Sequence, residues 1–284
     1  MRPELEDTYG ILKLQDKILE IMVYIDEFCR KHGITYFLMG GSALGAMRHG
    51  GFIPWDDDLD IFMDYENYQK FIRCCESDLD TERFHFQKED SPELPYFFSK
   101  IRMNGTACLS EVRNRKGNPH EGIFVDIMCL NYAAKTGFGR KIQYYAAGML
   151  KAKAITKTTY RAKGIVKKLQ LLVSKLVVWG PFKKLLLFLV RRHNKKKTDT
   201  FAHLFGRARF ANSFYPVADF AEQRFVPFEQ VSLPVALNVE NYLTIRYGEQ
   251  YMQMPDEETK ALYQTHATVW DTEKNYTEYR KNNN

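Results

Sequence analysis

The chain has 284 residues, of which 45% are hydrophobic and 27% charged, and its net charge is +6. This length and composition can bury a substantial core, as one domain with an appendage or as two domains. The five cysteines are an odd number with no Cys-x-x-Cys pair and no zinc-ligand spacing, which argues against a disulfide framework or a zinc site. We expect reduced thiols in a cytosolic setting, and the first residues lack the apolar core of a signal peptide.

A small-residue turn follows the first helix and strand. Residues 9–32 have a helical period that ends at Gly33, and residues 34–39 form an apolar, β-branched strand. Gly40, Gly41 and Ser42 come next, and Ser42 is a good N-cap for a short helix through Arg48. Because a strand, a glycine turn and a helix start bring backbone N–H groups together, the turn is a candidate phosphate site.

Four carboxylates follow this helix within five residues: Asp56, Asp57, Asp58 and Asp60. If a strand begins at Asp58, side chains alternate, so Asp58 and Asp60 point the same way, and Asp56 joins them if the strand starts earlier. Such carboxylates repel each other, and a dication between them turns the repulsion into binding; hard oxygen ligands suit Mg²⁺. The alternative is a solvated acidic turn, although Trp55 before the run and an apolar strand after it favour a site.

Two later strands carry further candidates. Residues 96–103 predict a strand on which Phe98, Lys100 and Arg102 share a face, either to offset a diphosphate's charge or as a solvent-facing edge. In the strand 123–128, Asp126 lies among apolar residues, where a carboxylate needs a cation or hydrogen bonds. Asp126 is thus a candidate metal ligand or general base, or one partner of a structural salt bridge, for instance with Arg102.

The charge is distributed unevenly. Residues 127–198 contain 18 Lys and Arg and no Asp or Glu, which leaves 23 of the 41 basic residues against all 35 acidic ones elsewhere, a balance of −12. Apolar stretches at 169–178 and 185–190 are flanked by cations and are too short to span a bilayer. They predict two basic amphipathic helices on an anionic membrane surface. The alternatives are a nucleic-acid-binding segment, which the long apolar runs disfavour, and a helical subdomain whose apolar faces pack internally.

The C-terminal part is acidic again. Residues 225–234 predict a hairpin and 239–247 a helix that stops at Gly248, and the polar tail from Asp271 is expected to be frayed.

The segment from Phe37 to Met63 resembles the signature of LicD-type phosphotransferases, a branch of the nucleotidyltransferase fold that includes fukutin and the fukutin-related protein. Arg48-His49 before Gly-Phe-Ile-Pro-Trp-Asp-Asp-Asp is the most distinctive part. Further similarities are Gly122-Ile123-Phe124-Val125-Asp126-Ile127 and Tyr242-Leu243-x-x-Arg246-Tyr247-Gly248. The chain departs from the family after Asp126, where members often have Pro-Leu-Asp.

This resemblance implies an α/β (α+β) fold with a nucleotidyltransferase-like mixed sheet, flanking helices and an inserted basic helical segment. The expected divisions are a catalytic core at 1–132, a membrane-surface helical segment at 133–198, and a part completing the catalytic domain at 199–284. The implied catalytic residues are Asp58, Asp60 and Asp126, with Asp56 as a further metal ligand. Substrate binding is expected at Gly41, Ser42, Arg48, Trp55, Lys100, Arg102 and His120.

The implied activity transfers phosphocholine, or a related group, from CDP-choline or a related CDP-activated donor to a cell-surface glycan precursor, with release of CMP. It requires Mg²⁺ or Mn²⁺. The acceptor is expected to be linked to a lipid, and the protein to lie in the cytoplasm, peripherally bound to the inner face of the cell membrane and without a nucleic-acid partner. The alternatives are a nucleotidyltransferase that adds NMP from an NTP to a small acceptor, and a non-catalytic adaptor for a membrane or polyanion.

Overall fold

The structure is a computed structural model and describes residues 7–112, 114, 119–256, 258, 260 and 267–281. Its helices are α1 (Leu12–His32), α2 (Gly40–His49), α3 (Tyr65–Asp78), α4 (Gly137–Ile155), α5 (Ile165–Val177), α6 (Gly180–Arg191), α7 (Val239–Tyr247) and α9 (Tyr276–Lys281), with 3-10 turns η1 (Phe210–Asn212) and η2 (Val217–Phe220). Its strands are β1 (Phe37–Leu38), β2 (Asp60–Asp64), β3 (Phe84–Gln87), β4 (Ser99–Met103), β5 (Ala107–Ser110), β6 (Phe124–Tyr132), β7 (Thr200–Ala202), β8 (Phe214–Pro216), β9 (Gln223–Phe228), β10 (Val231–Ala236) and β11 (Ala267–Asp271).

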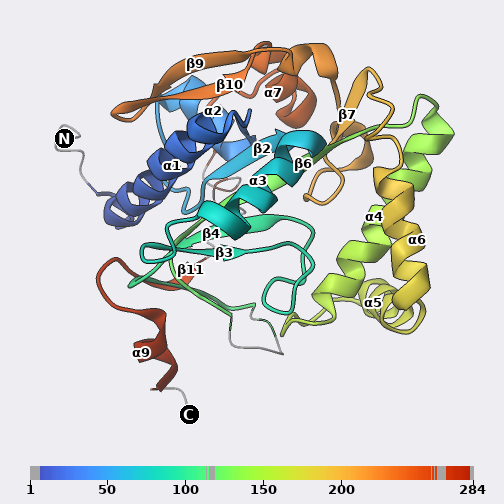
Figure 1. Cartoon of the computed structure of the whole chain (residues 1–284), viewed down its shortest axis with the longest axis horizontal. Helices are drawn as coiled ribbons and strands as arrows, with labels where there is room; N and C mark the ends of the chain where they lie inside the picture. Colours follow the sequence, from blue (N-terminus) through green and yellow to red (C-terminus); the bar gives the residue numbers. More distant parts are fainter. Residues whose placement is uncertain are drawn as a thin grey trace.

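The predicted mixed α/β class is confirmed. A seven-stranded sheet runs in the order β1-β2-β6-β4-β3, and β7 extends it from β6 to β8 (Figure 1). Strands β2 and β6 are parallel, whereas the other paired strands in this sheet are antiparallel. The predicted hairpin is β9–β10, and α1 and α7 occupy the predicted helical ranges.

Three predicted strands are shorter than expected, and one of them is β4, which begins at Ser99 and not at residue 96. The strand expected at 34–39 is β1, two residues long, and the chain leaves the sheet at Gly40, which has a left-handed φ of 54°. Because β1 ends there, residues 56–59 have no β1 partner, and β2 begins at Asp60 instead of the expected Asp58. The backbone N–H of Met39 donates to the Asp60 carbonyl at 3.0 Å, which closes the pair.

The expectation of a frayed tail from Asp271 is wrong. Strand β11 pairs antiparallel with β5, and the N–H of Tyr276 donates to the carbonyl of Thr106 at 3.1 Å. The Arg280 guanidinium also contacts the Glu121 carboxylate at 2.7 Å. These contacts hold the described end of the chain against β5 and against the residues that lead into β6.

Different elements of the chain pack against the two faces of the sheet. Helices α1 and α3 lie against one face, as Figure 1 shows, and bury the odd-numbered positions of β2 and β6, such as Ile61 and Ile127. The C-terminal elements cover the opposite face, where Phe62 packs edge-on against Phe220 and Tyr242. Even-numbered side chains of β2 and β6 therefore project toward the C-terminal part of the chain.

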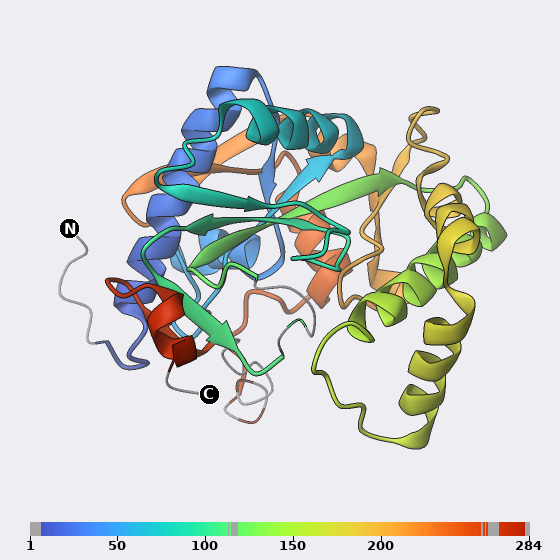
Figure 2. The same cartoon turned by 60° about the horizontal axis from the view of Figure 1, so that its bottom comes forward.

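Helices α4 to α6 form a separate layer at one side of the sheet (Figures 1 and 2). The buried apolar residues of α4 and α6 pack together in a second core: Ala146, Ala147, Leu150, Leu186 and Val190. In α5, by contrast, Ser174 is the one buried residue. None of the helices in the described part of the chain is both long enough and apolar enough to cross a bilayer.

A buried histidine lies beneath the C-terminal elements. His203 is 2% exposed, its Nε2 lies 3.2 Å from the sulfur of Met128, and its ring meets that of Phe62 edge-on. Burial, together with the charges of Arg246 and Lys151, lowers the pKa of His203 to about 3. The folded protein therefore holds this imidazole neutral at pH values where the unfolded chain protonates it.

This difference predicts acid sensitivity. The unfolded state binds the proton below a pKa of about 6.5, so the stabilising contribution is complete above that pH and is lost as the pH falls toward the folded pKa. Urea unfolding at pH 7 and pH 5 is expected to show that His203→Gln removes about 2 kcal/mol of the wild-type pH dependence. Equal pH dependence in the two proteins would contradict the assignment.

Candidate active site

Three charged side chains stand in one row across the sheet. Asp60 on β2 is in register with Asp126 on β6, and Asp126 is in register with Lys100 on β4. Residues that face each other in paired strands project from the same side of a sheet, and neighbouring strands are about 4.8 Å apart. The sheet thus brings together two predicted catalytic carboxylates and a predicted substrate cation that are up to 66 residues apart in sequence.

The start of α2 lies directly beside this row. The helix begins at Gly40, its N-cap position is Met39, and the expectation that Ser42 is the N-cap is wrong. Ser42 is instead buried in the first turn, and its hydroxyl accepts the backbone N–H of Asp60 at 2.9 Å. The hydroxyl therefore holds the first residue of β2 in place, next to the predicted Gly41–Ser42 turn.

The acidic run alternates in burial although it is not a strand. Asp57 and Leu59 are buried, whereas Asp56, Asp58 and Asp60 are half-buried, as the predicted alternation requires. The buried carboxylate of Asp57 accepts the N–H of Ala267 at 2.8 Å, so it anchors the loop to β11. The other three aspartates remain as the candidate site residues.

Asp56 lies against the first turn of α2. A Cβ added to Gly41 would come within 2.5 Å of Asp56 Oδ2, so the carboxylate would have to leave its present position. Negative charge is favourable at a helix N-terminus, where the peptide dipoles leave positive charge. The absence of a side chain at Gly41 therefore lets a third carboxylate, that of Asp56, lie at the site.

The surroundings of Asp60 strongly disfavour the negative charge of its carboxylate. Burial raises its pKa well above the usual range, and three neighbouring carboxylates raise it further: Asp58, Asp126 and Asp56. The Lys100 ammonium lowers it. Among the described residues, none donates a hydrogen bond to the buried Asp60 Oδ1. A buried carboxylate oxygen without a donor, surrounded by like charges, is an environment that a cation would stabilise.

Asp126 is held by an ion pair that the sequence did not specify. Its Oδ1 lies 2.5 Å from Lys100 Nζ, and both residues are 8% exposed. The partner of Asp126 in this salt bridge is thus Lys100 and not Arg102, which the sequence analysis had suggested. Lys100 Nζ also lies 3.4 Å from the ring centroid of Phe124, and burial lowers the pKa of this ammonium while Asp126 raises it.

The carboxylates fit a divalent ion only in part. Within the described residues, no three His, Cys, Asp or Glu side chains are arranged so that they could hold a metal ion by themselves. Mg²⁺, however, commonly takes one or two protein carboxylates and fills its other positions with water and substrate phosphate. The orphaned Asp60 oxygen and the adjacent Asp126 fit that mode of binding, with Asp56 and Asp58 near enough to contribute charge.

Two other predicted substrate residues contact the protein itself. Arg48 donates from Nη1 to the carbonyls of Tyr251 and Gln253, at 3.2 and 3.0 Å. Trp55 packs against Tyr9, with ring centroids 5.9 Å apart, and Lys260 Nζ lies 5.0 Å from its ring centroid. Arg48 therefore ties α2 to the segment after α7.

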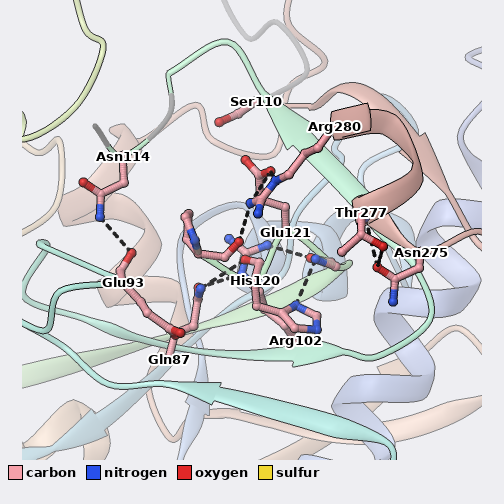
Figure 3. A network of polar contacts seen from close by, with 12 residues as sticks. Gln87, Glu93, Arg102, Ser110, Asn114, His120, Glu121, Asn275, Thr277 and Arg280 are labelled. Carbon is pink, nitrogen blue, oxygen red and sulfur yellow. Dashed lines mark hydrogen bonds and ion pairs between the residues drawn. The ribbon is translucent and has the colours of Figure 1, made fainter. Parts of the chain in front are cut away.

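Arg102 and His120 belong to a neighbouring polar network (Figure 3). Arg102 donates to the Gln87 side chain and to the Gly122 carbonyl, both at 2.6 Å. His120 stacks on His85 with centroids 4.9 Å apart, and burial lowers its pKa to about 3. Arg102 lies two register positions along β4 and β6 from the Asp126 row, and the network holds the residues that lead into β6.

Helix α7 supplies residues that the predicted site did not include. The hydroxyl of buried Tyr242 accepts the N–H of Gly40 at 2.8 Å, and the Tyr247 hydroxyl would lie 3.5 Å from a Cβ at Gly40. Burial raises the pKa of Tyr247, and the Asp56 and Asp60 charges raise it as well, which places it near the carboxylates. The motif from Tyr242 to Gly248 was visible in the sequence, but nothing in the sequence indicated that its residues contact the glycine turn at Gly40.

The fold is a mixed α/β sheet with a charged row on one face, and comparison with known proteins assigns the part of the chain that carries this row. Residues 33–129 match the LicD/FKTN/FKRP nucleotidyltransferase domain, so this part of the chain is a LicD-family domain and the expected resemblance is confirmed. The row of Asp60, Lys100 and Asp126 lies wholly within the matched range.

Individual relatives match over shorter parts. The chain is 31% identical over 109 residues to the lipopolysaccharide cholinephosphotransferase LicD of Haemophilus influenzae, covering 38% of this chain and 40% of that protein. It is 62% identical over 29 residues to the human ribitol 5-phosphate transferase FKRP, covering 10% of this chain and 6% of that protein. An uncharacterized protein of Rickettsia typhi is 30% identical over 99 residues, or 28% of this chain and 32% of that protein. The matches thus span well under half of each relative.

The contact between Gly41 and Asp56 predicts the effect of a single methyl group. In Gly41→Ala the Asp56 carboxylate has to move, and we expect the affinity for Mn²⁺, measured by calorimetry, to fall about 10-fold. Gly148→Ala is the matched control, because a Cβ there meets nothing within 4 Å in α4. It is expected to raise stability by about 0.5–1 kcal/mol without changing Mn²⁺ binding. Equal Mn²⁺ affinities in the two variants would exclude Asp56 from the site.

Proposed function

We propose that the chain is a metal-dependent phosphotransferase that moves phosphocholine, or a related phospho-substituent, from a CDP-activated donor to a hydroxyl of a lipid-linked cell-surface glycan precursor. We place it in the cytoplasm, at the inner face of the cell membrane. The observation that carries the proposal is the row formed by Asp60, Asp126 and Lys100 beside the first turn of α2. The LicD-family match and the printed activities of the relatives supply the reaction class.

The residues of the site have complementary roles in this proposal. Asp60 and Asp126, with Asp58 and Asp56 beside them, would hold Mg²⁺ or Mn²⁺, which supplies charge neutralisation to the phosphoryl oxygens. Lys100 offsets the charge that develops on those oxygens, and its burial strengthens the interaction because water screens it poorly. The first turn of α2 offers backbone N–H groups to the donor's diphosphate.

The reaction is a substitution at phosphorus. The acceptor hydroxyl oxygen forms a bond to the phosphorus that carries the choline group, and the bond between that phosphorus and the bridging oxygen breaks. The bridging oxygen leaves as part of CMP, and the hydroxyl proton passes to a carboxylate of the site. The protein's contribution is to position the reactants and stabilise the phosphoryl charge.

Asp60→Asn is predicted to separate activity from stability. Loss of this carboxylate should reduce turnover at least about 100-fold, because it removes a charge that the transition state requires. Without metal, the variant should be more stable than the wild type by about 1 kcal/mol, because a buried charge beside other carboxylates is removed. Exposed Asp199, changed to Asn, is the control and should alter neither quantity. Near-wild-type turnover in Asp60→Asn would refute the assignment.

Donor identity can be tested directly. Thermal unfolding with CDP-choline, CDP-ethanolamine or CDP-ribitol should show a rise in Tm for one donor that becomes larger when Mg²⁺ is present. Incubation with a glycan acceptor should then release CMP. Release of pyrophosphate from an NTP would favour a nucleotidyltransferase instead, and the absence of turnover with vesicle binding intact would favour an adaptor.

A further inference from the structure

Helix α5 turns its apolar side away from the protein. Its large apolar side chains recur at helical spacing and are exposed: Ile165, Val166, Leu169, Leu172, Val173, Leu176 and Val177. Ile165 and Val166 are each 79% exposed and Leu176 is 68% exposed, whereas Ser174 on the opposite side is 2% exposed. A surface helix normally packs its apolar stripe against the core, so α5 has the reverse orientation. We refer to these seven residues as the α5 face.

The orientation of α5 distinguishes two of the predictions for residues 127–198: helices on a membrane surface, and a helical subdomain that packs internally. Internal packing describes part of α4 and α6, which share the second core through residues such as Leu150 and Val190, although Leu185 and Phe188 of α6 are exposed. It does not describe α5, whose contact with α4 includes the Lys153 Nζ bond to the Lys175 carbonyl at 2.8 Å. An exposed apolar face of this size indicates a binding surface.

The charge around the α5 face specifies its partner. Lys168 and Lys175 are exposed on the same helix, and the range 127–198 contains 18 cationic residues without a carboxylate. Apolar side chains bordered by lysines match a lipid surface, in which acyl chains lie beneath anionic headgroups. A second copy fits poorly, because a symmetric contact would bring two like-charged surfaces together.

We propose that the α5 face inserts into the interface of an anionic bilayer and docks the protein there. Insertion removes the exposed leucine, isoleucine and valine side chains from water, and the flanking lysines contact the headgroups. This inference deepens the proposed function. Its biological purpose rests on that function, because a lipid-linked acceptor would reach the active site at a membrane surface. The binding itself needs neither donor nor turnover.

The test is sedimentation of the full chain with vesicles of phosphatidylcholine containing about one third phosphatidylglycerol, compared with phosphatidylcholine alone. The wild type should bind the anionic vesicles, and added salt should weaken the binding. Leu172→Gln combined with Leu176→Gln should reduce the partition coefficient about 10-fold or more. Phe225→Gln combined with Leu237→Gln is the matched control, because both of these side chains are exposed on or beside the β9–β10 hairpin.

Further variants separate the two proposals. Asp60→Asn should bind vesicles like the wild type, so a failure of the catalytic assignment leaves this measurement unchanged. Lys168→Gln combined with Lys175→Gln should weaken binding to anionic vesicles and reduce its salt dependence. Equal binding by the α5-face variant and the hairpin control would overturn the inference. Loss of a dimer in the α5-face variant, with vesicle binding unchanged, would assign the face to a second copy and would also overturn it.

Discussion

The parallel register between β2 and β6 is the constraint on which the site depends. It sets Asp60 beside Asp126, so two carboxylates share one face where burial penalises their charge. A sheet shifted by one residue would turn one of them to the opposite face, against α1 and α3. The next strand compensates in part, because β4 places Lys100 opposite Asp126. The registers of β2 and β4 against β6 thus create the acidic site and place beside it the cation that balances it.

Distant parts of the chain hold the loop that precedes β2. Glu229, at the turn of the β9–β10 hairpin, accepts the N–H of Phe52 at 3.0 Å, and a Cβ on Gly51 would collide with its carboxylate. At the other end of the loop, Asp57 accepts the N–H of Ala267. Helix α7 completes the arrangement through the Tyr242 hydroxyl on Gly40. The family match ends at residue 129, yet the residues that position its glycine turn and acidic loop come from the C-terminal part.

The helical layer and the sheet divide the chain's charge between them. The residues outside 127–198 have a negative balance and include the site proposed to bind a cation, whereas residues 127–198 have a positive balance and include the exposed α5 face. The two proposals therefore concern oppositely charged parts of one molecule. Their joint consequence is an orientation in which the helices meet the lipid and the sheet carries the chemistry.

The sequence by itself determined most helices, the hairpin and the carboxylates, because hydrophobic period and turn chemistry are local properties of the chain, and its resemblance to a known family implied the mixed class. It also singled out Asp60, Asp126 and Lys100, although not the ion pair that joins the last two. Only the tertiary structure decided that Arg48 and Arg102 bind backbone carbonyls, that Ser42 supports Asp60, and that the tail pairs with β5. Such contacts join residues far apart in the chain, and a residue's type does not name its partner. The direction of the α5 face was undecided for the same reason: an amphipathic pattern is identical whether its apolar side faces the core or the solvent, and only packing against α4 distinguishes the two.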